Sequence, residues 1–436
     1  MGSGQGRFRQ RCRGEPLGEP PDAQALRFLD DLTQETRYRA VLESDGSGGA
    51  GMTEKTWTLT DVSDGTWLET FSASSRDLNL PDDVHWTVSK RTLRGGLQDG
   101  VEIVEVDNGD LRFTVLPTRG MGLWKGSYRG MALGWDSPVR GPVHPRWVNL
   151  PDREGIGWLQ GFDEWIVRCG LYSMGPPGLD RWTSPQGESR SAPLTLHGRI
   201  ANLPACFLQV RVETESPYGI SVIGHVEESM LFYPRIELCS TVTTWPRSNR
   251  LLLQDQVRNS GGQPTEMQLL YHCNFGPPLL GAGAGFRAPI ARATPRDAYP
   301  AEAVRALHTY GKPGSSRQEE VYFMELLGAS SHRKTLAVLH DRAREKAVAL
   351  RFHLSQLPFF TLWKYAGSEQ DGYVTGLEPG TGYPNFRSLE RERGRLGVLQ
   401  PGEAASFELE VEAHEQPAGV SLLLEEIRQL QDEHGG

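Results

Sequence analysis

The sequence predicts an all-β protein built from two large antiparallel sheets that pack face to face. Apolar and polar residues alternate in runs of four to eight between about residues 84 and 411, and turn residues separate the runs. An alternation with a period of two is typical of strands that have one apolar face. The 50 glycines and 29 prolines among the 436 residues supply many turn positions. Because sheets of this size must bury their apolar faces, the pattern indicates a sandwich of two sheets.

The chain divides into three parts by composition. Residues 1–51 are rich in Gly, Pro and Arg and end in a Gly- and Ser-rich stretch that is typical of a flexible linker. We expect this part to be disordered or a non-native extension. Residues 52–415 are expected to form the sandwich as one domain, and residues 416–436 to form a C-terminal helix and tail. The clearest strands, in chain order, are expected at residues 100–107, 111–116, 208–213, 219–226, 236–242 and 407–412.

The C-terminal segment has a helical rather than a strand pattern. Its apolar residues recur three or four positions apart, which predicts one apolar stripe along a helix over residues 419–431. The stripe consists of Val420, Leu423, Leu424, Ile427 and Leu430. We expect this short helix to pack against the domain.

The charge balance narrows the class of partner. The 46 Lys and Arg residues against 55 Asp and Glu residues give a formal net charge of −9. Nucleic acids and anionic membranes attract positively charged surfaces, so neither is expected as a partner. The sequence also has no apolar run of about 18 residues, which a membrane-spanning helix would need. We expect a small-molecule ligand; the sequence does not predict the oligomeric state.

The cysteines and the N-terminus suggest a compartment. The five cysteines form no CxxC pair, and an odd number cannot close into a complete set of disulfides. Reduced thiols are typical of the cytosol. The arginines near the N-terminus are not followed by the apolar stretch of a secretory signal. We therefore expect a cytoplasmic protein.

Three short segments place titratable residues among glycines, prolines and aromatic residues. They are residues 195–202 around His197, residues 269–278 around His272, and residues 373–385 around Glu378. Taken singly, each has an ordinary structural interpretation: a satisfied histidine, a histidine at a strand end, and a solvated carboxylate. Taken together, two histidines and a carboxylate are the minimum set for moving a proton between two oxygens.

Aromatic and hydrogen-bonding residues accompany these segments. Tryptophan and tyrosine rings can stack on the C–H face of a sugar, although a tryptophan on a strand more often belongs to a core. We expect one or two of these rings to contact a ligand: Trp135, Trp158, Trp165, Trp363 and Tyr365. Arg119, Arg199 and Asn274 are candidates for hydrogen bonds with sugar hydroxyls.

The motifs carry a resemblance to a known superfamily. His197-Gly-Arg199, His272-x-Asn274-Phe275 and Glu378-Pro are similar to the motifs of the aldose 1-epimerase (galactose mutarotase) superfamily. A closer similarity, to a largely uncharacterised bacterial branch, extends over about residues 53–415 and rests on the order of several segments. These segments are residues 93–101, 116–121, 133–138, 155–159 and 196–202.

The resemblance implies a fold and a reaction. The fold would be a β-supersandwich with a shallow open cleft on one face of the larger sheet. The reaction would interconvert the anomers of a sugar without a metal or other cofactor. Glu378 would be the general base and His272 the acid that protonates the ring oxygen, with His197 orienting the substrate or sharing that role. The residues expected to bind the substrate are Arg119, Arg199, Asn274 and Trp165.

Two departures from the usual mutarotase pattern leave the sugar open. Gly198 is followed by Arg199 rather than by a second glycine, which is nearer the hexose-6-phosphate epimerase version. The second histidine stands in Tyr-His-Cys-Asn-Phe, residues 271–275, rather than in Asn-His-x-Tyr-Phe. Neither motif decides whether the sugar is phosphorylated or acidic.

Three alternatives to a mutarotase remain open. A glycoside hydrolase or lyase would need a second carboxylate or a tyrosine facing the base, and Asp163, Glu164 and Tyr172 are candidates. A non-catalytic sugar-binding protein would have no need for both histidines and the glutamate. A metal-dependent isomerase could use the same three residues as ligands. Convergence of His197, His272 and Glu378 on one place would favour the enzyme.

Overall fold

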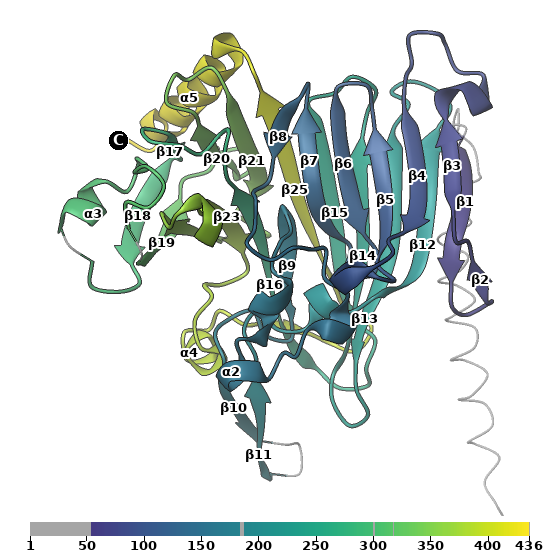
Figure 1. Cartoon of the computed structure of the whole chain (residues 1–436). Helices are drawn as coiled ribbons and strands as arrows, with labels where there is room; N and C mark the ends of the chain where they lie inside the picture. Colours follow the sequence, from purple (N-terminus) through teal and green to yellow (C-terminus); the bar gives the residue numbers. More distant parts are fainter. Residues whose placement is uncertain (1–53, 184–186, 300, 317, 436) are drawn as a thin grey trace, which may run out of the picture. The chain divides into compact units, whose positions relative to one another are not determined.

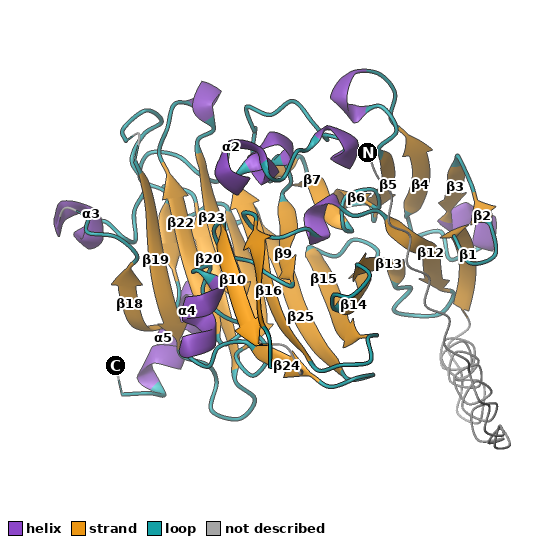
Figure 2. Cartoon of the chain, turned by 90° about the horizontal axis from the view of Figure 1, so that it is seen from below, coloured by secondary structure: helices purple, strands orange, loops and turns teal. Residues whose placement is uncertain are grey.

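The structure is a computed structural model that describes residues 54–183, 187–299, 301–316 and 318–435. Our expectation for residues 1–51 falls outside this described part of the chain. Two large antiparallel sheets make up most of it (Figures 1 and 2). The predicted all-β sandwich is therefore confirmed.

The smaller sheet has ten strands. In spatial order they are β17 (Gly285–Arg287), β20 (Lys334–His340), β21 (Ala347–His353), β25 (Ala404–His414), β15 (Arg250–Asn259), β14 (Arg235–Thr244), β13 (Ile220–Ser229), β12 (Ala205–Glu213), β1 (Glu54–Asp61) and β2 (Thr66–Trp67). Successive strands along the chain mostly pair as neighbours, from β12 to β15. This connectivity follows from the short turns between the alternating runs.

The larger sheet has thirteen strands. Its main order is β18 (Ile290–Pro295), β19 (Glu319–Leu326), β22 (Phe359–Tyr365), β23 (Val374–Gly380), β16 (Thr265–Phe275), β9 (Ile166–Leu171), β7 (Gly122–Tyr128), β6 (Leu111–Leu116), β5 (Glu102–Asp107), β4 (Thr87–Thr92) and β3 (Phe71–Ser74). β24 (Gly397–Leu399) pairs with β16, and β8 (Met131–Leu133) pairs with β7. Figure 2 shows β19, β22, β23, β16 and β9 in this order. The strand order brings segments that are distant in the chain together on β16, which pairs with β9, β23 and β24.

A separate hairpin and several short helices complete the described part. β10 (Gly178–Thr183) pairs with β11 (Ser189–Leu194). The short helices are α2 (Asp152–Gly155), α3 (Ala301–Arg305), α4 (Arg387–Glu392), η1 (Ser75–Leu78), η2 (Gly96–Gln98), η3 (Pro145–Trp147), η4 (Gly157–Gly161), η5 (Ile200–Asn202) and η6 (Glu369–Asp371). In Figure 1, α2 and α4 lie beside the upper end of the β10–β11 hairpin.

The strands predicted from alternation are present. The segments expected at residues 100–107 and 111–116 contain β5 and β6, and those at residues 208–213, 219–226, 236–242 and 407–412 fall largely within β12, β13, β14 and β25. In β14 every second side chain is buried, beginning with Ile236. A fully buried Val or Leu contributes about 1.5–3 kcal/mol to stability. Because each strand buries one face, apolar residues are needed at every second position, and this alternation can be recognised in the sequence.

The C-terminal helix α5 (Pro417–Asp432) is confirmed. Val420, Leu423, Ile427 and Leu430 are buried, and Leu424 is partly buried. They pack against residues of β20 and β21, among them Leu336 and Ala349. None of the helices that the structure describes is long and apolar enough to cross a membrane.

A buried polar cluster joins the two sheets. Arg168 of β9 in the larger sheet forms an ion pair with Asp255 of β15 in the smaller sheet, with Nη2 2.9 Å from Oδ1. The hydroxyl of Tyr271 on β16 donates to the same carboxylate at 2.8 Å. Arg168, Tyr271 and Asp255 therefore point into the space between the sheets. Removing Arg168 or Asp255 would leave the other buried charge without its partner, which is strongly destabilising.

Candidate functional site

The candidate site begins with two side chains that face each other across neighbouring strands. β16 and β23 pair with Leu270 opposite Gly380 and Cys273 opposite Leu377, which sets His272 opposite Glu378. Nε2 of His272 lies 3.2 Å from Oε1 of Glu378. Because successive side chains alternate between the faces of a strand and Tyr271 points between the sheets, His272 points to the outer face. His272 is 5% exposed and Glu378 is 2% exposed.

His197 reaches the same place from a turn. Its backbone has a φ of 58°, in the left-handed region, and Gly198 follows with a φ of 73°. A Cβ on Gly198 would lie 2.1 Å from the carbonyl oxygen of Ser173, so the close passage of the chain requires glycine there. The ring of His197 lies 5.5 Å from that of His272, centre to centre, and its Nδ1 is 2.9 Å from the carbonyl oxygen of Met174. His197, His272 and Glu378 thus converge.

Aromatic rings surround His272 on the outer face. Phe162, Trp363 and Trp158 lie 5.2, 5.4 and 6.3 Å from its ring, centre to centre. Trp158 also packs edge-on against His197 at 4.7 Å. Trp158 and Phe162 come from η4 and the residue that follows it, and Trp363 comes from β22. This aromatic wall includes two of the five rings named from the sequence; Phe162 was not identified from the sequence.

Trp165 does not belong to this wall. It is 0% exposed and lies in the core between the sheets. A Cβ on Gly126 of β7 would lie 2.5 Å from its ring, so the ring fills the space that this glycine leaves. The prediction that Trp165 binds the substrate is therefore wrong. The sequence could not show which face of the sheet this ring occupies.

Arg119 also has a different place from the one predicted. It is 1% exposed, and its Nε is 2.7 Å from Oε1 of Glu164. Its Nη1 donates to the carbonyl of Val143 and to Asn202, and its Nη2 to the carbonyl of Gly161. All three nitrogens are engaged by the protein, so none is left for a sugar hydroxyl. Arg199, in contrast, is exposed at the start of η5, and its contact with a substrate stays a prediction.

Asn274 contacts His272 instead of facing outward. It is 0% exposed, and its Oδ1 lies 2.6 Å from Nδ1 of His272. Its Nδ2 donates to the carbonyl of Glu164 at 3.0 Å and to that of His272 at 3.1 Å. The predicted hydrogen bond from Asn274 to a substrate is therefore replaced by a contact with a candidate catalytic side chain.

Burial controls the protonation of the three converging groups. Loss of water around the ring lowers the pKa of His272 to about 3; the nearby His197 lowers it further, and the hydrogen bond to Asn274 opposes the shift. Burial likewise lowers the pKa of His197 to about 4. Burial raises the pKa of Glu378 well above its usual range, with a further increase from Glu319. These directions favour a neutral pair in which the proton resides on Glu378, whereas a general base must be ionised to accept a proton.

The rim of the site includes two residues that the sequence analysis missed. Oε2 of Glu319, at the start of β19, accepts a hydrogen bond from Nε1 of Trp363 at 3.0 Å, and Oε1 lies 2.7 Å from Nη2 of Arg296. Glu319 and Arg296 follow no motif, and only their hydrogen bonds, from Trp363 to Glu319 and from Arg296 to Glu319, reveal them. Of the described residues, Thr361 Oγ1 and Trp158 Nε1 are buried polar atoms of this region with no hydrogen-bond partner, and Glu378 Oε1 has no contact of this kind other than its 3.2 Å approach to Nε2 of His272.

The three residues considered for a hydrolase or lyase are engaged elsewhere. Glu164 pairs with Arg119. Asp163 accepts a hydrogen bond from Nε1 of Trp124 at 2.9 Å, and burial with the nearby Glu164 raises its pKa to about 8. The hydroxyl of Tyr172 donates to Asp180 at 2.8 Å. None of these contacts places a second acid opposite Glu378.

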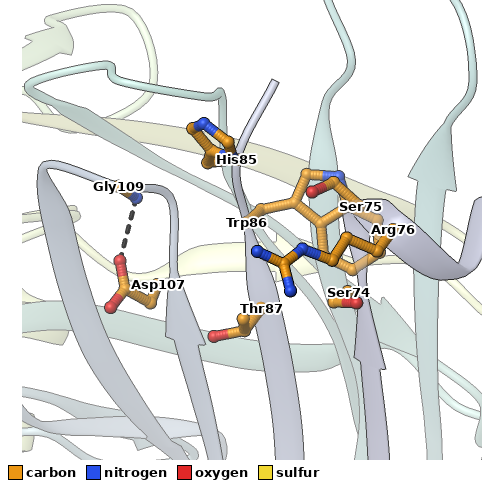
Figure 3. A pocket seen from close by; sticks show the side chains of 8 residues that line it. All are labelled: Ser74, Ser75, Arg76, His85, Trp86, Thr87, Asp107 and Gly109. Atoms are coloured by element: carbon orange, nitrogen blue, oxygen red, sulfur yellow. Dashed lines mark hydrogen bonds between the residues drawn. The ribbon is translucent and has the colours of Figure 1, made fainter. Parts of the chain in front are cut away.

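Two further observations concern metal ligands and cavities. Within the described ranges, no group of three or more His, Cys, Asp or Glu side chains is arranged to hold a metal ion. A cavity of about 330 Å³ lies elsewhere, where η1, β4 and β5 meet (Figure 3). Asp107 in its lining accepts a hydrogen bond from the backbone of Gly109 at 2.8 Å. The cavity shares no lining residue with the His272 group.

Comparisons with solved structures identify the fold. A crystal structure of a candidate aldose 1-epimerase from Klebsiella pneumoniae subsp. pneumoniae is 35% identical, with a TM-score of 0.81, and the match covers 87% of this chain and 96% of that one. A galactose mutarotase-like protein from Clostridium acetobutylicum is 14% identical, with a TM-score of 0.54, and the match covers 77% and 100%. A candidate aldose 1-epimerase from Escherichia coli K12 is 15% identical, with a TM-score of 0.50, and the match covers 72% and 100%. The last two show the fold alone, which is that of the galactose mutarotase-like proteins.

A comparison with protein families gives the assignment. None of the curated proteins matches this sequence. A family model described as a domain of unknown function, DUF4432, matches residues 98–413. These residues span β5 to β25 except for its last residue and include every group of the candidate site. The chain therefore belongs to the DUF4432 family, a branch of uncharacterised proteins with the galactose mutarotase-like fold.

Proposed function

We propose that the protein is a sugar isomerase of the aldose 1-epimerase type, which interconverts the two anomers of an aldose. The observation that carries this proposal is the pairing of His272 Nε2 with Glu378 Oε1 at 3.2 Å beside His197. A carboxyl group and an imidazole at this distance are suited to share one proton and to act as acid and base on two nearby oxygens.

The reaction needs one base and one acid. The base removes the proton from the C1 hydroxyl while the acid protonates the ring oxygen O5, and the C1–O5 bond breaks. The free aldehyde rotates about its C1–C2 bond, and O5 attacks the other face of C1 as the two protons return. No atom or electron is gained or lost overall, so the sugar leaves as its other anomer.

Glu378 is assigned as the base and His272 as the acid, with His197 orienting the substrate. Burial favours the shared proton on Glu378, because it raises the pKa of that carboxyl group. A sugar hydroxyl that donates to Glu378 would stabilise the carboxylate, and the proton would pass 3.2 Å to Nε2 of His272. The total number of protons on the pair does not change. General acid and general base each contribute about 10²–10⁴-fold to the rate.

The surroundings suit an amphipathic ligand such as a sugar. Trp363 is partly exposed and offers an apolar surface for C–H groups, while Trp158 and Phe162 are buried beside the ring of His272. The unpartnered Thr361 Oγ1 and Trp158 Nε1 could bind hydroxyls. Thr361 lies directly opposite Glu378 in the β22–β23 pairing. Arg199 remains the candidate for a contact at the exposed side.

The test is a screen of freshly dissolved single anomers by polarimetry or NMR. Aldoses, uronates and sugar phosphates are each followed with the wild-type chain, with Glu378→Gln and without protein. Catalysed mutarotation by the wild type, and a loss of about 10²-fold or more in Glu378→Gln, would support the proposal. Binding of a sugar without catalysis would favour a sugar-binding protein instead. Activity that EDTA removes and a divalent metal restores would make the three residues metal ligands.

A further inference from the structure

We propose that Asn274 is a positioning residue that fixes His272 in one tautomer, with the proton on Nδ1, so that only Nε2 exchanges protons. This inference deepens the proposed function and rests on it for its catalytic consequence. The claim about the tautomer of His272 concerns the protein without a substrate and does not depend on the proposed function. It assigns Asn274 a role other than the substrate contact that the sequence predicts.

The amide of Asn274 has only one orientation that satisfies its neighbours. Its Nδ2 lies 3.0 Å from the carbonyl oxygen of Glu164 and 3.1 Å from that of His272, and both oxygens can only accept. If the amide were rotated by 180°, its oxygen would face two carbonyl oxygens. Asn274 is 0% exposed, so water cannot relieve such a contact. Oδ1 therefore faces His272.

Further contacts hold this amide in place. The backbone N–H of Asn274 donates to the carbonyl of Trp165 at 2.7 Å. The carbonyl of Glu164 also accepts a hydrogen bond from Nε1 of Trp135, at 3.1 Å. The side chain of Glu164 is paired with Arg119, so the segment that supplies the carbonyl is fixed at both its side chain and its backbone.

This orientation determines the tautomer. Oδ1 of Asn274 is an acceptor, and at 2.6 Å from Nδ1 of His272 it requires a proton on that nitrogen. In the neutral ring, Nε2 then has a free lone pair, and it is the atom that faces Glu378 Oε1 at 3.2 Å. The opposite tautomer would put two acceptors together at Nδ1 and leave no lone pair toward Glu378.

The same arrangement occurs at His197. Its Nδ1 is 2.9 Å from the carbonyl oxygen of Met174, which also can only accept. Both rings are thus held with the proton on Nδ1 and with Nε2 as the unprotonated nitrogen. At His197 the acceptor is part of the backbone, whereas at His272 it is a side chain that substitution can remove.

The experiment measures the tautomer directly and the rate separately. Imidazole ¹⁵N signals of His272 are assigned by comparison with His272→Asn, in the wild type, Asn274→Leu and Asn274→Asp. We expect a protonated Nδ1 and an unprotonated Nε2 in the wild type. Asn274→Leu removes the acceptor at similar size and should give a mixture of tautomers. Asn274→Asp retains an oxygen acceptor for Nδ1. In its protonated form its O–H replaces Nδ2 as a donor to the carbonyl oxygens, so it should restore the wild-type pattern.

A matched control separates this role from a loss of stability. Asn259 on β15 is also 0% exposed and donates to two carbonyls, those of Gln263 at 2.8 Å and Leu399 at 2.9 Å. Asn259→Leu should lower the unfolding temperature without changing the His272 signals or the rate. Asn274→Leu should lower kcat by at least about tenfold with little change in KM, as expected for impaired proton transfer.

The outcomes distinguish the inference from the proposed function. A wild-type His272 with its proton on Nε2, or one whose tautomer is unchanged in folded Asn274→Leu, would overturn the inference whatever the activity. A wild-type His272 with the expected tautomer in a protein that catalyses no mutarotation would retain the positioning role of Asn274 and reject the proposed function.

Discussion

Gly376 leaves the space in which the carboxylate of Glu378 lies. A Cβ built on Gly376 would be 2.4 Å from Oε1 of Glu378, 3.1 Å from Cε1 of His272 and 3.2 Å from Cε3 of Trp363. The two residues are on the same face of β23, two positions apart. The missing side chain at residue 376 is therefore part of what allows Glu378 to approach His272.

The first prediction follows from this contact. Gly376→Ala should push the carboxylate away from His272 and lower kcat by about tenfold or more, since a small misplacement of reacting groups is costly. Gly262→Ala is the control, because a Cβ there meets nothing within 4 Å. The rates are measured by mutarotation and the folding of both variants by thermal unfolding. Full activity of a folded Gly376→Ala would show that the position of Glu378 is not critical.

The second prediction concerns the acid and the base. Glu378→Gln preserves the shape of the side chain but removes its proton acceptor, so kcat should fall about 10²-fold or more with KM nearly unchanged. His272→Asn should have a similar effect. Steady-state kinetics on the sugar found in the screen measure both. Mutarotation at the full rate by Glu378→Gln would rule out this residue as the base.

The third prediction separates His197 from the other two. Because its role is assigned to orientation, His197→Asn should raise KM at least as much as it lowers kcat. The variant loses the edge-on contact with Trp158 at 4.7 Å. A purely kcat effect of the same size as that of His272→Asn would assign His197 to proton transfer instead.

The fourth prediction concerns pH and stability. The pKa of His272 is lowered from 6.5 to about 3 by burial, and that of His197 from 6.5 to about 4. For each histidine, between its lowered native pKa and the unfolded value of 6.5, the unfolded chain binds a proton that the native protein does not. The free energy of unfolding therefore decreases as pH falls below about 6.5. Each histidine should contribute a slope of up to about 1.4 kcal/mol per pH unit in this range.

The slope is measured by urea unfolding at several pH values between 4 and 7. His197→Asn and His272→Asn should each show a shallower decline than the wild type. Glu378 has the opposite sign: its pKa is raised by burial, so its contribution is present at low pH and is lost as pH rises through the raised pKa. Unchanged slopes in both histidine variants would contradict the burial of these rings.

The fifth prediction tests the place of Arg119. Arg119→Met leaves Glu164 buried without a partner and should destabilise the fold by about 3–5 kcal/mol. The control is Arg91→Met, which breaks the exposed pair with Glu105 and should cost less than about 1 kcal/mol. Denaturant unfolding measures both. If Arg119→Met were as stable as the wild type and had a raised KM, the result would instead support a contact between Arg119 and the substrate.

The sequence predicted the secondary-structure elements whose pattern of buried residues lies within a single strand or helix. The alternation of β14 and the helical spacing of α5 could be recognised because each element buries one face. The pairing of His272 with Glu378 could be anticipated only from the resemblance, because the two residues are brought together by a sheet order in which β16 lies between β9 and β23. No pattern within a single strand encodes that order.

The errors at Arg119, Trp165 and Asn274 have a common cause. Each side chain is of a type that sugars bind, but its partner is distant in the chain or on the face that the sequence could not assign. Arg119 pairs with Glu164, 45 positions away, and Trp165 fills the space at Gly126. The amide of Asn274 is fixed by the carbonyl of Glu164, 110 positions away, which directs its Oδ1 to His272.

The two faces of β16 have consequences for how such a protein can change. Tyr271 anchors one sheet to the other, and the adjacent His272 faces Glu378. Inserting or deleting one residue in this strand would exchange the two side chains and damage folding and chemistry together. Changes of ligand preference during evolution are therefore expected in η4 and in the turn before η5, which contribute Trp158 and His197, while the length of β16 stays constant.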